Sequence, residues 1–143
     1  MVQKISRKLF TIARYFWNLN MAKRKVKTVA QEVEAAAKLL QRLVRLKASD
    51  DNGYCQCVTC GKVDHYKAMQ GGHFMPRGRT VFKLYEPNIH PQCPSCNLWG
   101  MKQSHYVLRY RQWMVDYYGE RRVKAMERLA WRASPVYFYS ITV

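Results

Sequence analysis

The sequence has few acidic side chains: 9 Asp and Glu residues face 25 Lys and Arg residues, which gives a formal net charge of +16. This charge is far outside what solubility requires and favours a polyanionic partner, so we expect nucleic acid. Residues 1–50 carry twelve basic and three acidic side chains and residues 101–143 carry eight and three, whereas the middle is nearly balanced. If the flanks clamp a nucleic-acid backbone, affinity falls steeply with salt; a merely solvated basic face is the alternative.

The sequence also lacks a convincing secretion signal, a membrane-spanning run, an internal repeat and a low-complexity segment. Residues 9–17 are mostly apolar, but Arg14 interrupts them and no small-residue cleavage site follows. Neither a signal peptide nor a membrane span is therefore expected, and a basic amphipathic helix fits this stretch better. Because Met21 resembles a natural start, residues 1–20 are either part of the protein or a dispensable upstream extension.

The chain is long enough for one domain with extensions. Thr28 and Gln31 form a capping-box pattern before apolar positions at helical spacing, which predicts a helix over residues 29–48. Glycines, prolines and short apolar runs follow, and they predict a cysteine knuckle and then two short strands around residues 70–75 and 80–92.

Helical spacing returns after Cys96 and is broken at Gly100. It then predicts two further helices, over residues 104–119 and from 120 to about 132. The predicted division of the chain is a basic amphipathic N-terminal extension (1–21), an N-terminal helix (22–53), a core (54–103), C-terminal helices (104–134) and an apolar tail (135–143).

The five cysteines favour metal binding in a reducing compartment over disulfides, because their number is odd and four of them form two C-x-x-C pairs. Cys57-Val-Thr-Cys60 and Cys93-Pro-Ser-Cys96 supply the four thiolates of a tetrahedral Zn²⁺ site. Four sulfur ligands leave no open position, so this zinc is expected to be structural and to staple the ends of an inserted hairpin. Redox-active or merely buried cysteines are the alternative. Cys55 is interpreted as a spare thiol that could otherwise replace Cys57.

Further motifs lie inside and just after the stapled segment: Gly71-Gly72-His73-Phe74, Asn88-Ile-His-Pro-Gln-Cys93, and Asn97 directly after Cys96. In this order they resemble the NinG/Rap group of lambdoid phage recombination endonucleases, a branch of the His-Me finger (HNH-like) nucleases, over roughly residues 38–125. The resemblance implies an α+β fold, with a zinc-stapled ββα-metal (His-Me finger) core flanked by basic α-helices. It also implies a phage-encoded protein that acts in the cytoplasm of the bacterial host, without a membrane partner.

The resemblance implies His73 on the first strand as general base, Asn88 in the connecting loop, and Asn97 at the start of the helix as anchor of a catalytic Mg²⁺ or Mn²⁺. These residue types suit phosphodiester hydrolysis, because imidazole titrates near neutral pH and a hard cation takes oxygen ligands. Asn88 would tie the loop through hydrogen bonds and hold His73 in aim. A structural histidine and a helix-capping asparagine are the alternatives for His73 and Asn97.

Many HNH relatives carry an Asp immediately before the general base as a second metal ligand, whereas this chain has Gly72. Either Asn97 alone among the side chains holds the catalytic metal, or the fold brings in another ligand. The candidates for that ligand are Asp64, His90 and His105. The candidates for contacts with phosphate or DNA are Arg77, Arg79, Lys83, Arg109 and Arg111.

The resemblance implies a structure-specific endonuclease that cuts branched DNA, including four-way (Holliday) junctions, during phage recombination. One alternative is a nonspecific, nicking or packaging-associated HNH endonuclease, and another is a noncatalytic zinc-stabilised DNA-binding module. Symmetric cutting of a junction needs two active sites, so a homodimer is expected. The helix over 29–48, the aromatic-rich helix over 104–119 and the tail over 135–143 are possible dimer surfaces. The aromatic helix could instead stack on unpaired bases, with its arginines gripping phosphates.

Overall fold

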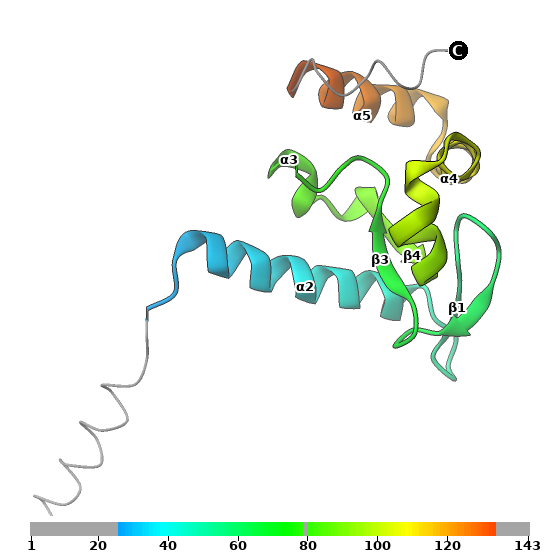
Figure 1. Ribbon diagram of the computed structural model, residues 1–143, viewed down its shortest axis with the longest axis horizontal. Coiled ribbons are helices and arrows are strands. Elements are labelled where there is room, and N and C mark those ends of the chain that lie inside the picture. The colour runs from blue at the N-terminus through cyan, green and yellow to red at the C-terminus, as the bar shows by residue number, and fades with distance from the viewer. Residues whose placement is uncertain (1–25, 79, 134–143) are drawn as a thin grey trace, which may run out of the picture. The chain divides into compact units, whose positions relative to one another are not determined.

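The structure is a computed structural model that describes residues 26–78 and 80–133 (Figure 1). The chain divides into two units, Met1–Glu32 and Val33–Val143. The predicted extension over 1–21, the tail over 135–143 and Arg79 lie outside the described residues.

The first helix of the described chain, α2 (Val29–Lys47), agrees with the helix predicted over residues 29–48. Its capping box is confirmed: the Thr28 backbone N–H donates to Gln31 Oε1 at 2.9 Å, and the Gln31 N–H donates to Thr28 Oγ1 at 3.3 Å. These two bonds satisfy backbone donors that a helix start leaves without partners.

A tight turn follows α2. The Asp50 carboxylate accepts hydrogen bonds from the backbone N–H groups of Asn52 at 3.0 Å and Tyr54 at 2.8 Å. Gly53 adopts a φ of 82°, a left-handed conformation that other residues rarely take. The turn chemistry of this segment therefore ends the helix and starts the first strand.

Two antiparallel hairpins form the middle of the chain, each a separate two-stranded sheet. The first pairs β1 (Tyr54–Gln56) with β2 (Val63–His65), and the second pairs β3 (Gln70–His73) with β4 (Ile89–Gln92). The first predicted strand therefore corresponds to β3. The prediction of a continuous strand over 80–92 is wrong in its first half, which forms a short helix, α3 (Thr80–Lys83), and a 3₁₀ turn, η1 (Glu86–Asn88).

The chain after β4 is helical. A π-helical turn, η2 (Ser95–Trp99), and a 3₁₀ turn, η3 (Gly100–Lys102), precede two helices, α4 (Ser104–Tyr118) and α5 (Glu120–Ala133). The two predicted C-terminal helices are thus confirmed. They meet at Gly119, which has a φ of 82° and donates its N–H to the Val115 carbonyl at 2.8 Å.

Two groups of buried side chains hold these elements together. The larger group joins the segment after β3 and α3 to the two C-terminal helices, and the smaller group surrounds the cysteines. The larger group is Phe74, Met75, Phe82, Tyr110, Met114, Val123, Met126 and Ala130. The described chain is therefore an α+β fold in which small sheets pack among helices. Among the described residues, no helix is both long and apolar enough to cross a membrane.

Candidate functional site beside a four-cysteine cluster

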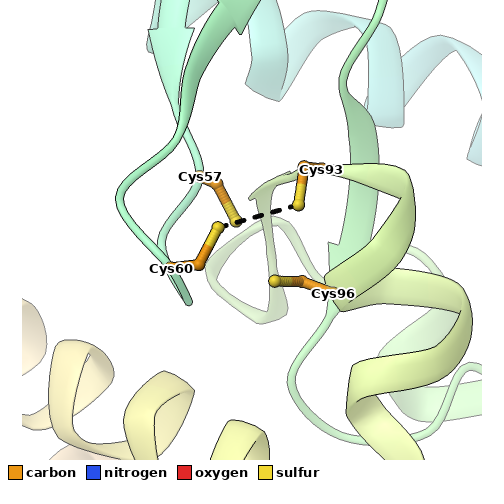
Figure 2. A group of neighbouring side chains, drawn as sticks. All are labelled: Cys57, Cys60, Cys93 and Cys96. Carbon is orange, nitrogen blue, oxygen red and sulfur yellow. Dashed lines mark hydrogen bonds between the residues drawn. The ribbon is translucent and has the colours of Figure 1, made fainter.

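The four cysteines of the two C-x-x-C pairs converge on one point (Figure 2). Cys57 and Cys60 come from the turn of the β1–β2 hairpin, and Cys93 and Cys96 from the segment between β4 and η2. All four Sγ atoms lie within 4.8 Å of one another, and those of Cys60 and Cys93 are 3.7 Å apart. A tetrahedral zinc site with bonds of about 2.3 Å has sulfur–sulfur edges of roughly 3.8 Å, so the cluster fits a structural metal such as zinc.

The thiols of this cluster differ in how readily they ionise. Burial opposes ionisation of Cys93, but hydrogen bonds from the Ser95 hydroxyl and the Cys96 backbone lower its pKa to about 6. Burial raises the pKa of Cys60. Cys55 is buried but does not belong to the cluster, and burial raises the pKa of its thiol. The structure thus gathers the four predicted cysteines and leaves Cys55 aside.

A cavity of about 490 Å³ brings together side chains that the sequence analysis singled out. His73 at the end of β3, Arg77 beyond it and Asn97 in η2 all line this cavity. Arg111 of α4 and Glu127 of α5 line it as well, and so do Gln41 of α2 and the apolar side chains of Met75, Met101 and Leu108. An imidazole, an amide and a guanidinium therefore line one partly open cavity.

His73 is partly buried, and its Nε2 lies 3.5 Å from the Lys83 carbonyl oxygen. Burial lowers the pKa of His73 below its usual value of 6.5, and the nearby Arg77 charge acts in the same direction, while the Lys83 carbonyl opposes the shift. The imidazole is consequently neutral at pH 7, which is the form that accepts a proton.

Asn88 is fully buried in η1 and bridges the two ends of the loop after His73. Its Oδ1 accepts from the Met75 N–H at 2.7 Å, and its Nδ2 donates to the carbonyls of Met75 at 3.0 Å and Phe82 at 3.2 Å. These bonds tie the loop, which is the kind of contact that the sequence analysis expected of Asn88. The influence of Asn88 on the orientation of the His73 side chain stays a prediction.

Asn97 is oriented by a residue that the sequence analysis did not single out. Its Nδ2 donates to Gln70 Oε1 at 2.7 Å across the contact between η2 and β3. Because the amide nitrogen of Asn97 makes this bond, the bond sets the orientation of the amide and the direction in which its oxygen points. Gln70 stands three residues before His73 on the same strand, but a lone glutamine carries no signal of such a role.

The space beside Gly72 is filled by Gln92. A Cβ atom at position 72 would lie 1.8 Å from Gln92 Oε1 and 2.6 Å from its Cδ. Gln92 is fully buried, and its Nε2 donates to Thr59 Oγ1 at 2.6 Å. Its Oε1 is the one buried side-chain polar atom that lacks a hydrogen-bond partner within residues 26–78 and 80–133. A side chain at position 72 therefore requires Gln92 to shift.

The three residues considered as substitutes for that Asp do not line the cavity. Asp64 lies on β2, and its Oδ2 is 3.0 Å from Nζ of Lys62, the residue before that strand. His105 is an exposed residue of α4. His90 uses both ring nitrogens: Nδ1 lies 2.9 Å from the Tyr110 hydroxyl and Nε2 lies 3.0 Å from the Tyr118 hydroxyl. Burial lowers the pKa of His90 to about 4, so it is a neutral structural residue here.

Three of the basic residues predicted to contact phosphate pair with carboxylates, at two places in the fold. Arg77 and Lys83 both pair with Glu34 of α2, a residue that the sequence analysis did not single out. Arg111 is held by carboxylates of α5, because its guanidinium donates to Glu127 Oε1 at 2.6 Å and Oε2 at 3.2 Å, and to Glu120 at 3.1 Å.

Arg111 thus ties α4 to α5. Arg109 is exposed on α4 and does not line the cavity. Of the predicted phosphate-contacting residues, the structure places Arg77 and Arg111 at the cavity, and it places Lys83 beside His73 through the Lys83 carbonyl.

A family model described as bacteriophage lambda NinG protein matches residues 7–133. No curated protein and no solved structure gives a significant match to the chain. The match spans both cysteine pairs and every residue named at the cavity.

Proposed function

The chain belongs to the bacteriophage lambda NinG family of recombination-related phage proteins, and on this premise we propose that it is a divalent-metal-dependent endonuclease that hydrolyses phosphodiesters in branched DNA. We assign the cavity lined by His73, Arg77 and Asn97 as its active site. The β3–β4 hairpin and the following turn η2 would form the ββα-metal core of a His-Me finger. The four cysteines would hold the structural Zn²⁺ that fixes the hairpin ends.

One observation carries the proposal: His73 and Asn97 line the same cavity, although 24 positions separate them in the sequence. The two cysteine pairs bracket His73, and Asn97 directly follows the last cysteine, so binding of one metal by the cluster would fix both elements at once. A neutral imidazole, an oriented amide and a guanidinium in one volume are the groups that phosphodiester hydrolysis requires.

The hydrogen-bond geometry suggests how His73 works. If Nε2 carries the proton and donates it to the Lys83 carbonyl, Nδ1 is left as the proton acceptor. Nδ1 takes a proton from a water molecule, and the water oxygen bonds to phosphorus. The bond to the leaving oxygen breaks, and that oxygen keeps the electron pair and takes a proton from solvent water. The bonds of Asn88 to the loop hold Lys83 and Met75 in place during this step, since Asn88 bonds to Phe82 next to Lys83.

The amide oxygen of Asn97 is the residue atom best suited to hold a catalytic Mg²⁺ or Mn²⁺, because such ions prefer oxygen ligands and keep several waters. When bound, the ion supplies positive charge to the phosphate and the leaving oxygen. Gln70 would keep the amide oxygen of Asn97, rather than its nitrogen, available for that contact. Arg77 would hold a phosphate oxygen.

We further propose that branched DNA, such as a four-way junction, is the partner. The net charge of +16 suits a polyanion that contacts several parts of the surface. Two symmetric cuts in a junction need two active sites, so we propose a homodimer acting in the cytoplasm of the bacterial host.

The experiment compares cleavage of labelled four-way junction, fork and linear duplex in the presence of Mg²⁺ or Mn²⁺. We expect faster cleavage of the branched substrates and loss of cleavage in Asn97→Ala, with Asn52→Ala in the exposed turn as the matched control. Equal rates on linear and branched DNA would contradict the substrate assignment. Cleavage by Asn97→Ala at the rate of Asn52→Ala would contradict the metal anchor.

A further inference from the structure

One carboxylate pairs with two of the basic residues predicted to contact phosphate. Glu34 Oε1 accepts from the Arg77 guanidinium, and Glu34 Oε2 lies 3.0 Å from Lys83 Nζ. Its two oxygens thus face two different cations, which come from the loop after β3 and from α3. The bonds from Lys83 and then Arg77 lower the pKa of Glu34 to about 2, so the carboxylate is charged at neutral pH.

This arrangement is the one that a phosphate group of DNA would adopt. A carboxylate and a phosphodiester each present two acceptor oxygens and a negative charge, and both are bound by guanidinium and ammonium donors. Glu34 is not enclosed, since 38% of its side chain is exposed to solvent, and 44% of the Arg77 side chain is exposed. The Lys83 side chain is 25% exposed, so an incoming phosphate can reach both cations.

We propose that Glu34 occupies, in the DNA-free protein, the place that one DNA phosphate takes between Arg77 and Lys83 in the complex. DNA must displace Glu34 before it gains these two contacts. This inference rests on the DNA binding proposed above, but it does not depend on cleavage.

The displacement is connected to the proposed base. Lys83 offers its ammonium group to Glu34 and its carbonyl oxygen to His73 Nε2. Arg77 pairs with Glu34 and lines the cavity with His73. Arg77 and Lys83 therefore exchange Glu34 for a phosphate close to His73. The exchange places the bound DNA strand beside the proposed proton acceptor.

The exchange also lowers the affinity for DNA. A phosphate that replaces an existing ion pair gains less free energy than one that meets two unpaired cations. Because this cost is the same for every DNA that reaches the two cations, it lowers the affinities for linear and branched DNA by a similar factor.

The test measures DNA binding without divalent ions, by fluorescence anisotropy with labelled four-way junction and short linear duplex. The variant is Glu34→Gln, and its matched control is Glu32→Gln. Glu32 lies on the same helix and pairs with Lys27 at 3.5 Å, so the control removes the same charge elsewhere. We expect Glu34→Gln to bind DNA about 3- to 10-fold more tightly than Glu32→Gln, the range that two exposed ion pairs can supply.

A second pair of variants tests the location. In an Arg77→Ala background, the gain from Glu34→Gln should shrink markedly, because one of the freed cations is absent. Equal affinities of Glu34→Gln and Glu32→Gln would overturn the inference, and so would a gain that Arg77→Ala leaves unchanged. Tight binding in this assay, together with no cleavage of the same DNA after Mg²⁺ or Mn²⁺ is added, would contradict the proposed nuclease function alone. Absence of binding in every variant would contradict both proposals.

Discussion

A side chain at position 72 in β3 would collide with Gln92. A Cβ at this position would lie 1.8 Å from Oε1 of the buried Gln92, whose Nε2 donates a hydrogen bond to Thr59 Oγ1. In this fold the side chain of residue 92 fills the volume that residue 72 would need.

Gly72→Ala should lower the free energy of unfolding by about 1–3 kcal/mol, because a methyl group is forced onto a packed amide. The matched control is Gly78→Ala, where a Cβ would meet nothing within 4 Å. Urea unfolding of both variants measures the difference. Shortening the neighbour in Gly72→Ala/Gln92→Ala should recover part of the loss, and a Gly72→Ala protein as stable as Gly78→Ala would contradict this packing account.

The lowered pKa of His73 makes a prediction for the pH dependence of cleavage. The neutral imidazole is the active form, and a pKa below 6.5 means that this form persists to lower pH than for an ordinary histidine. The acid limb of kcat/KM against pH should therefore have its midpoint below 6.5 in the full-length protein. A midpoint above 6.5 would contradict the assignment, and His105→Ala, a change on exposed α4, should leave the profile unchanged.

Several residue-scale contacts had no signal in the sequence. Glu34 pairs with Arg77 across 43 residues, and Gln70 orients Asn97 across 27. Sequence patterns identify residue types that suit chemistry, such as His73 and Asn97, but an ion pair between distant elements depends on how those elements pack. The motif residues could therefore be predicted from the sequence, whereas Glu34 and Gln70, which pair with them, could not.

At the scale of elements, local signals predicted the helices well. The capping box fixed the start of α2, and left-handed Gly119 separates α4 from α5 where the apolar spacing changes. The strand predicted over residues 80–92 is wrong in its first half for a physical reason. Phe82 packs into the larger core from α3, and a helix of four residues is too short to show the helical spacing of apolar residues. The three-residue strands β1 and β2 were equally hard to predict, because no alternation develops over that length.

The four-cysteine cluster joins two elements that share no continuous sheet, and it should decide whether they stay together. Cys96→Ser should lose the bound zinc, lower the thermal midpoint sharply and expose the β3–β4 hairpin to proteolysis. Binding of structural zinc contributes about 10–16 kcal/mol in zinc-finger peptides, so little else could replace it. Zinc content and thermal unfolding measure both effects.

Cys55→Ser is the matched control for that prediction, because Cys55 is buried beside the cluster but outside it. It should keep its zinc. A Cys96→Ser protein with undiminished zinc and thermal stability would contradict the structural role of the cluster.

At the scale of the whole molecule, the pattern of charge predicted a polyanionic partner, but it did not predict how many cations are already paired. Arg111 is engaged by two carboxylates of α5, and Arg77 and Lys83 by one carboxylate of α2. Each of these three predicted phosphate contacts would therefore have to replace an existing ion pair. The family and the α+β class were within reach of the sequence, because the ordered motifs carry them.

The most direct test of the account is cleavage of a labelled four-way junction by His73→Ala, with His105→Ala as the matched histidine control. Zinc content and thermal unfolding should be the same in both variants, so that any difference comes from chemistry. Loss of a general base predicts a fall of at least about 100-fold in the cleavage rate of His73→Ala, with no comparable fall in His105→Ala. Junction cleavage by folded His73→Ala at the rate of the unaltered protein would contradict the assignment of this cavity as the active site.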